Sequence, residues 1–246
     1  MSSRVVVITG AGAGIGRALA KGFASDGFTV VGLGRTPESL NETGAGCAPG
    51  RFLPIVADVS EHAVVDRAIQ SVLTSHGPID ALVCNAAVYP RVHFLDQPAE
   101  DWERALLINV CGVANCCRSV LPGMLERNHG RIVVVGSFAD LNPIPASSAY
   151  AASKGAIHAL VRALSSEIDR TYYPDVLINE FNPGVTQTSM SSYGDPPEAA
   201  CPRVKKLVDF PSGGPTGRLF VQDREVVLNE SLKRRLLRMV GLGRRR

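Results

Sequence analysis

The chain lacks an uninterrupted apolar run of about eighteen residues, the length that a membrane-spanning helix requires. It also lacks the separate basic and apolar regions of a signal peptide, because a strand-like apolar run starts at Val5. From these two absences we expect a protein that has no membrane span and is located in the cytoplasm.

Patterns for metal binding and for disulfides are missing as well. None of the six cysteines forms a Cys-x-x-Cys pair, and no histidine lies at zinc-ligand spacing from any of them. We therefore expect reduced thiols and no metal site. Cys84, Cys111, Cys116 and Cys117 are expected to act as small core side chains.

The chain has little excess charge of either sign. A net charge of +3 gives no indication of nucleic-acid binding. The positive charge is unevenly distributed, however, because residues 232–246 contain seven Lys and Arg and no acid. Three states fit this basic tail: a disordered segment, an amphipathic helix on a neighbouring subunit, or a segment that binds an anionic surface.

Short apolar runs alternate with segments of helical periodicity. We expect strands at 5–9, 29–34, 52–57, 81–85, 131–137 and 176–182, and helices at 15–25, 63–74, 102–126 and 149–168. Alternation of this kind is typical of a doubly wound parallel sheet with helices on both faces. The sequence therefore predicts one α/β domain of the Rossmann type, spanning residues 1–246.

The alternation stops after Pro183 and Gly184. Residues 186–215 are rich in Ser, Pro and Gly, apart from a short helical patch near 202–208. Because long loops are usually functional or mobile, we interpret this segment as a lid over the substrate. A last strand, or a short hairpin around Gln222, Asp223 and Arg224, is expected within 216–228.

A glycine-rich loop joins the first expected strand to the first expected helix. It consists of Gly10, Gly12, Ala13, Gly14, Ile15 and Gly16, with Ala11 between the first two. Small residues let the backbone approach a pyrophosphate, and the free amides at the start of a helix favour an anion. The loop therefore predicts a dinucleotide site.

The end of the second strand indicates which dinucleotide binds. NAD sites usually have an acid there for the ribose hydroxyls, whereas an arginine accommodates the 2′-phosphate of NADP. Arg35 and Thr36 follow the strand in this chain, and Arg35 can bind that phosphate. We therefore favour NADP over NAD; the alternative is that Arg35 is a solvated loop cation.

Tyr150 and Lys154 lie one turn apart on an expected helix, thirteen residues after Ser137. An ammonium beside a phenol favours the phenolate, so we expect Lys154 to lower the pKa of Tyr150. Such a tyrosine exchanges protons near neutral pH. Ser137, Tyr150 and Lys154 are therefore candidate catalytic residues.

In this order the motifs resemble the single-domain short-chain dehydrogenases/reductases over roughly residues 4–190. The resemblance also rests on Asp58-Val59, Asn85-Ala86-Ala87, Asn109 and Pro183-Gly184, although the usual third residue of Asn-Ala-Gly is Ala87 here. The C-terminal part, from Pro211 onward, is similar to the carbonyl-reductase branch of the family.

The resemblance implies a role for each matching residue. Besides the glycine-rich loop, the cofactor site would comprise Arg35, Thr36, Asp58, Val59, Asn85, Ala86, Ala87, Tyr150, Lys154, Pro183, Gly184, Val185 and Thr186. Asn109 would hold a helix distortion and a water that relays protons to Lys154. Ser137 would bind the substrate oxygen, and Tyr150 would donate its proton as hydride arrives. The family also implies a homodimer or homotetramer.

The residues near this catalytic group are mostly apolar or aromatic. Beside Ser137 and Tyr150, the substrate site is expected to include Phe138, Met190 and Tyr193, which favours a small hydrophobic molecule. The predicted activity is NADPH-dependent reduction of a ketone or aldehyde. The alternatives are an NAD-linked secondary-alcohol dehydrogenase and a non-catalytic dinucleotide-binding sensor or interaction protein.

Two residues do not fit this scheme. Glu180 places a charge in an expected buried strand, and His158 has no neighbour in the sequence that suggests catalysis. We assign neither a role from the sequence.

Overall fold

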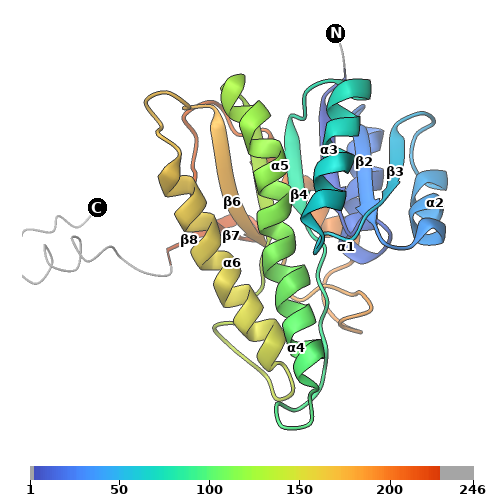
Figure 1. The fold of residues 1–246 in the computed structure, drawn as a ribbon, viewed down its shortest axis with the longest axis vertical. Helices are drawn as coiled ribbons and strands as arrows, with labels where there is room; N and C mark the ends of the chain where they lie inside the picture. Colours follow the sequence, from blue (N-terminus) through green and yellow to red (C-terminus); the bar gives the residue numbers. More distant parts are fainter. Residues whose placement is uncertain (1–2, 228–246) are drawn as a thin grey trace, which may run out of the picture.

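Eight strands form one sheet within residues 3–227, the part of the chain that this computed structural model describes (Figure 1). The basic tail, 232–246, lies outside the described residues. The strand order is β3-β2-β1-β4-β5-β6-β7-β8, and every neighbouring pair is parallel except β7 and β8. This confirms the predicted doubly wound α/β sheet.

The first six strands match the expected runs closely: β1 (Val5–Thr9), β2 (Thr29–Gly34), β3 (Phe52–Val56), β4 (Ala81–Cys84), β5 (Gly130–Val135) and β6 (Val176–Asn182). Two short strands follow, β7 (Leu219–Val221) and β8 (Arg224–Val226). The last two form the hairpin expected near Gln222, which adopts a positive φ of 52° in the turn.

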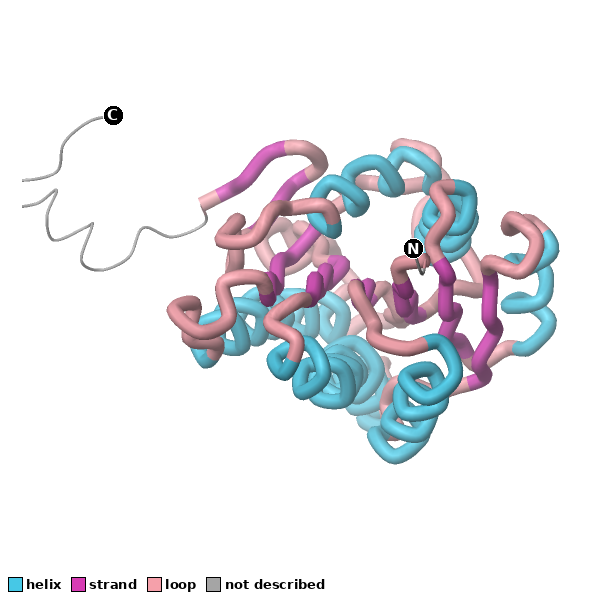
Figure 2. Tube along the Cα trace, turned by 90° about the horizontal axis from the view of Figure 1, so that it is seen from above, coloured by secondary structure: helices cyan, strands magenta, loops and turns pink. Residues whose placement is uncertain are grey.

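Helices cover both faces of the sheet, as the view from above shows (Figure 2). One layer contains α3 (His62–His76), α5 (Gly112–Glu126) and α6 (Ser148–Glu167), and the other contains α1 (Gly14–Ser25), α2 (Pro37–Ala45) and α7 (Ala200–Val208). Alternate residues of a strand point to opposite faces, so Val5 and Val7 pack under the first layer and Val6 and Ile8 under the second. Strands buried on both faces must be apolar throughout, which explains the continuous runs.

The long helix expected at 102–126 has a different form. It begins earlier, as α4 (Ala99–Leu106), passes through one π-helical turn (Leu107–Cys111), and continues as α5. By length and composition alone, its apolar stretch would suffice to span a membrane. Half of that stretch is buried, and α5 packs on α3, β4 and β5, so it is a core helix of this domain.

The segment 186–215, which we interpret as a lid, contains a helix where the sequence predicted a helical patch. Residues 200–208 form α7, whose side chains Cys201, Val204, Leu207 and Val208 are buried against the sheet and α1. An amphipathic helix packed in this way belongs to the core, so only the preceding loop remains available as a lid.

All six cysteines are free thiols, as expected. Cys84, Cys116 and Cys117 pack together in the core, whereas Cys111 is exposed, contrary to its expected core role. Hydrogen bonds with the thiols of Cys116 and Cys117, together with burial, raise the pKa of Cys84, which therefore stays protonated and unreactive.

Candidate active site

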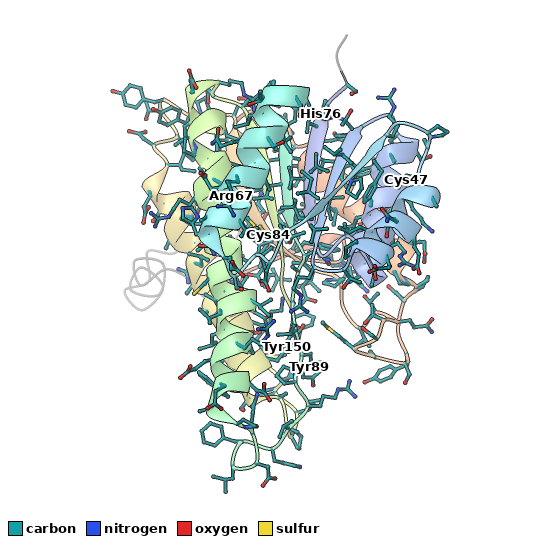
Figure 3. All side chains as sticks on the ribbon, turned by 45° about the vertical axis from the view of Figure 1, so that its right-hand side comes forward. Cys47, Arg67, His76, Cys84, Tyr89 and Tyr150 are labelled. Atoms are coloured by element: carbon teal, nitrogen blue, oxygen red, sulfur yellow. The ribbon has the colours of Figure 1, made fainter. Side chains whose placement is uncertain are left out.

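A cavity of about 500 Å³ opens where the parallel strands end. Its walls come from the loops that follow β1, β2, β4, β5 and β6. The chain reverses its winding direction between β1 and β4, and ligands of open α/β sheets bind at such a reversal. Tyr89 and Tyr150, which line the cavity, lie beyond this edge of the sheet in Figure 3.

The cavity brings together most of the residues singled out in the sequence. Those that line it are Gly10, Gly12, Ala13, Gly14, Ile15, Arg35, Thr36, Asn85, Ala86, Ala87, Ser137, Phe138, Tyr150, Lys154, Pro183, Gly184, Val185, Thr186, Met190 and Tyr193. Four others are not among the lining residues: Gly16, Asp58, Val59 and Asn109.

The glycine-rich loop is shaped for close approach. Gly10 has a φ of 65°, and a Cβ atom there would meet the backbone of Ala86 at 2.9 Å. The Thr9 hydroxyl accepts hydrogen bonds from the amides of Asn85 and Ala86, both at 2.9 Å, and so ties β4 to β1 at the crevice. These contacts fix the conformation of the loop, which leaves room for the phosphate groups of a ligand.

Two further features fit a dinucleotide. The first turn of α1 has no side-chain cap and no acid, so its amide groups remain available to an anion. The side-chain nitrogen of Asn182, a residue that lines the cavity, is buried and has no hydrogen-bond partner among the described residues. A buried donor of this kind is normally satisfied, and a bound ligand would provide the acceptor.

Arg35 lies at the end of the cavity that also contains Thr36 and Ser39. Its side chain is half exposed, and Nη1 lies 4.0 Å from Oδ2 of Asp58. Asp58 accepts hydrogen bonds from the amide and hydroxyl of Ser60, and it lies 3.8 Å from Arg104. Asp58 therefore has other partners and leaves Arg35 free to turn toward a ligand.

The three candidate catalytic residues meet at the opposite end. Ser137 follows β5, and α6 carries Tyr150 and Lys154 one turn apart, as its periodicity predicts. The Lys154 ammonium donates to the carbonyl of Val135 at 2.8 Å and lies 5.5 Å from the centroid of the Tyr150 ring. This geometry places a hydroxyl, a phenol and an ammonium around one space.

The pKa of Tyr150 differs from our expectation. Burial raises it above the ordinary value, and a hydrogen bond with the Ser137 hydroxyl offsets only part of the rise. Lys154 does not reverse the effect, because its ammonium is bound to Val135 rather than directed at the phenol oxygen. The prediction of a lowered pKa is therefore wrong for this structure.

Lys154 itself is strongly perturbed. It is 4% exposed, and burial lowers its pKa to about 8, while the nearby carboxylate of Glu180 acts in the opposite direction. An ammonium with this pKa changes its charge close to physiological pH.

Asn109 lies at the centre of the π-helical turn. Its side chain accepts from the amide of Val88 at 2.8 Å and donates to the carbonyl of Val88 at 2.9 Å and to the hydroxyl of Ser153 at 3.0 Å. These three bonds tie the distorted helix to the loop after β4 and to α6. Asn109 therefore supports the catalytic helix from behind the cavity.

Glu180 and His158 form a pair near the site, with His158 Nδ1 3.0 Å from Glu180 Oε2; Glu180 is buried and His158 is partly exposed. The sequence drew attention to both residues but did not indicate that they pair.

Tyr89 and Arg91 form a second group at the site, on the loop after β4, and both line the cavity. The Tyr89 ring lies against Tyr150, and the Arg91 guanidinium lies 5.0 Å above the Tyr89 ring.

The loop after β6 covers the cavity. Short bridges between Thr186 and Asp195 and between Thr188 and Ser191 fold it back on itself. The methyl group of Thr188 lies against Gly14, and Arg91 donates to the carbonyl of Met190. Residues 186–196 thus reach both ends of the cavity.

Comparison with known proteins agrees with this architecture. The family model for short chain dehydrogenases matches residues 4–198. The chain is 33% identical to the meso-2,3-butanediol dehydrogenase of Serratia marcescens over 77% of this chain and 74% of that protein. It is 35% identical to the oxidoreductase UcpA of Escherichia coli K12 over 78% and 72%, respectively.

Solved structures of the same kind superpose on it. Levodione reductase gives a TM-score of 0.82 at 25% identity, covering 90% of this chain and 96% of that one. NAD+-bound xylitol dehydrogenase gives 0.81 at 26% identity, covering 89% and 97%. The chain belongs to the short-chain dehydrogenase/reductase family and has the fold of an NAD(P)-dependent oxidoreductase of that family.

Proposed function

We propose that the protein reduces a ketone or aldehyde with NADPH, as a carbonyl reductase of this family. The observation that carries the proposal is the convergence of Ser137, Tyr150 and Lys154 on one end of a cavity whose other end is the glycine-rich loop. A non-catalytic dinucleotide sensor would not need all three side chains. Their joint presence supports an enzyme.

Each catalytic side chain has a distinct task. When bound, the dinucleotide supplies the hydride that reaches the carbonyl carbon. Ser137 donates a hydrogen bond to the substrate oxygen, and Tyr150 transfers its phenolic proton to that oxygen, so that the alcohol forms. The ammonium of Lys154 stabilises the phenolate that remains and binds the nicotinamide ribose.

The same side chains serve both directions of the reaction, because reduction uses the phenol of Tyr150 as proton donor and oxidation uses its phenolate as base. The direction therefore follows from the choice of cofactor and from the cellular ratio of its reduced and oxidised forms.

The proposed cofactor site covers the rest of the cavity. Arg35 and Thr36 bind the 2′-phosphate, which favours NADPH. Asn85, Ala86 and Ala87 lie on the adenosine side with Asp58 and Val59 behind them, and Pro183, Gly184, Val185 and Thr186 face the carboxamide. Two observations favour NADH instead. Arg35 is half exposed and faces Asp58, and a similar solved structure is a xylitol dehydrogenase with bound NAD+.

The proposed substrate site is lined by apolar groups. Phe138, Met190 and Tyr193 line the outer part of the cavity, and Phe138 and Tyr193 remain exposed at 36% and 69%. Exposed aromatic side chains beside a catalytic group suit a small hydrophobic carbonyl compound. We assign residues 186–196 the role of the lid.

Cofactor titration tests the proposal. The purified protein is titrated with NADPH and with NADH, followed by fluorescence, and carbonyl compounds are then screened for NADPH consumption. We expect tight NADPH binding and turnover that Tyr150→Phe abolishes without loss of cofactor affinity. Full activity of Tyr150→Phe would contradict the proton-transfer role, and binding without any turnover would favour a sensor.

Two arginine variants test the choice of cofactor. Arg35→Gln should weaken NADPH binding by about a hundredfold and NADH binding little, because a charge-assisted bond to phosphate is lost. Arg104→Gln is the matched control, since Arg104 also faces Asp58 but does not line the cavity. Equal losses for both cofactors in Arg35→Gln would rule out a phosphate contact.

A further inference from the structure

Glu180 is a charged side chain in an otherwise uncharged strand, and it is 3% exposed. Val176 and Ile178 of the same strand pack in the apolar layer beneath α6. The strand alternation directs the Glu180 side chain to that same face. A carboxylate in such a layer is costly unless it is paired, so its partners must account for its presence.

Both partners come from α6. His158 Nδ1 lies 3.0 Å from Glu180 Oε2, and Lys154 lies one turn before His158 on the helix. The His158 side chain is 21% exposed and reaches solvent, whereas Lys154 is buried and lines the cavity. Glu180 Oε2 contacts the imidazole, and Glu180 Oε1 lies against Gly136, next to Val135, whose carbonyl binds the Lys154 ammonium.

The sheet leaves room for this carboxylate. Gly136 of the segment after β5 lies against it, and a Cβ atom there would collide with Oε1. One further charged group, Asp140, opposes ionisation of Glu180. Burial raises the pKa of Glu180, and the charges of His158 and Lys154 oppose that rise.

We propose that Glu180 is a positioning residue that keeps Lys154 charged, and that His158 keeps Glu180 ionised. A negative charge behind the buried ammonium offsets its loss of hydration. Lys154 needs that charge to stabilise the Tyr150 phenolate and to bind ribose. The inference rests on the role of Lys154 in the proposed function.

The test is a titration of the full chain with NADPH between about pH 6 and pH 10, which spans the ionisation of a perturbed lysine. The wild-type affinity should fall as Lys154 loses its proton near pH 8. Glu180→Gln removes the charge of the side chain but keeps its shape. In this variant the decrease of NADPH affinity should occur about one pH unit lower than in the wild type, so binding should be about tenfold weaker at the most alkaline pH values. Glu180→Asp keeps the charge and should stay close to the wild type.

Two controls separate this role from a structural one. Glu167→Gln removes an exposed charge from the same helix and should leave the curve unchanged. In a Lys154→Met background, Glu180→Gln should no longer alter the pH dependence, because the effect acts through Lys154. Superimposable curves for Glu180→Gln and wild type would overturn the proposal.

A second variant tests the proposal if Glu180→Gln does not fold. His158→Leu removes the imidazole that hydrogen-bonds Oε2 of Glu180, so Glu180 takes up a proton more readily and the curve should move in the same direction by a smaller amount. An unchanged curve in this variant also contradicts the proposal. Because the measurement follows binding, it gives a result even if no carbonyl substrate is turned over.

Discussion

The ring of Tyr89 lies 4.4 Å from the ring of Tyr150, centroid to centroid, with the two planes tilted by 31° (Figure 3). This contact buries one face of the candidate proton donor, and burial is the main cause of its raised pKa. Tyr89 therefore helps to set both the orientation and the protonation state of Tyr150.

We expect Tyr89→Ala to lower kcat by about tenfold, because a loosened phenol meets the substrate oxygen less often in a reactive position. The pKa of Tyr150 should fall toward its ordinary value in this variant, and the pH profile of turnover should move to lower pH. Tyr89→Phe keeps the ring and is the matched control. If Tyr89→Ala turns over substrate at the wild-type rate, the ring contact has no catalytic role.

Arg91 connects the loop after β4 to the lid through Met190. We expect Arg91→Ala to raise KM about fivefold with little change in kcat, because the lid loses one hydrogen bond while the catalytic residues remain in place. Limited proteolysis should also cut within 186–196 more readily. Arg67→Ala, an exposed arginine on α3, serves as the comparison. A fall in kcat alone would place Arg91 in a different role.

Asp175 binds a buried arginine at the start of β5. Arg131 Nη2 lies 2.6 Å from Asp175 Oδ1, and His129 Nδ1 lies 2.6 Å from Oδ2. Asp175→Asn leaves the Arg131 charge without its partner and should lower the free energy of unfolding by about 3 kcal/mol at neutral pH. Chemical denaturation measures this, with the exposed Asp96→Asn as control.

The same pair makes a pH prediction. Although burial acts to raise it, hydrogen bonds and charges of His129 and Arg131 hold the pKa of Asp175 below its ordinary 3.8. The stabilisation is therefore complete above about pH 4 and is lost as the pH falls through the lowered pKa. The difference in the free energy of unfolding between wild type and Asp175→Asn should therefore decrease at low pH. A difference that stays constant as the solution is made strongly acidic would contradict this prediction.

Gly136 leaves space for Glu180, so Gly136→Ala should lower the free energy of unfolding by about 2 kcal/mol through overpacking. In a Glu180→Ala background the same substitution should cost much less, because its obstacle is gone. Equal costs in the two backgrounds would mean that the destabilisation arises elsewhere.

Much of the fold was predictable because its strands are buried on both faces. The bounds of β1, β2 and β6 coincide with their apolar runs. Helix α2 was not predicted, since it buries only Leu40 and Thr43 and has little apolar periodicity. The helix distortion at Asn109 was expected only from the family resemblance, because apolar periodicity does not show the contacts of Asn109 with Val88 and Ser153.

The candidate site also has parts that could be predicted from the sequence and parts that could not. Residues in local motifs, such as Tyr150 and Lys154, could be placed from their spacing. The Glu180–His158 pair could not, because it joins a strand to a helix 22 positions earlier. The pKa of Tyr150 was predicted with the wrong sign, since sequence spacing brings the ammonium near but gives no measure of burial.

One loop, 186–196, touches Gly14 at the dinucleotide end of the cavity and, through Met190, Arg91 at the substrate end. Under the proposed function, this loop would cover the cofactor and the substrate together, so that a single movement of 186–196 would open both ends of the cavity.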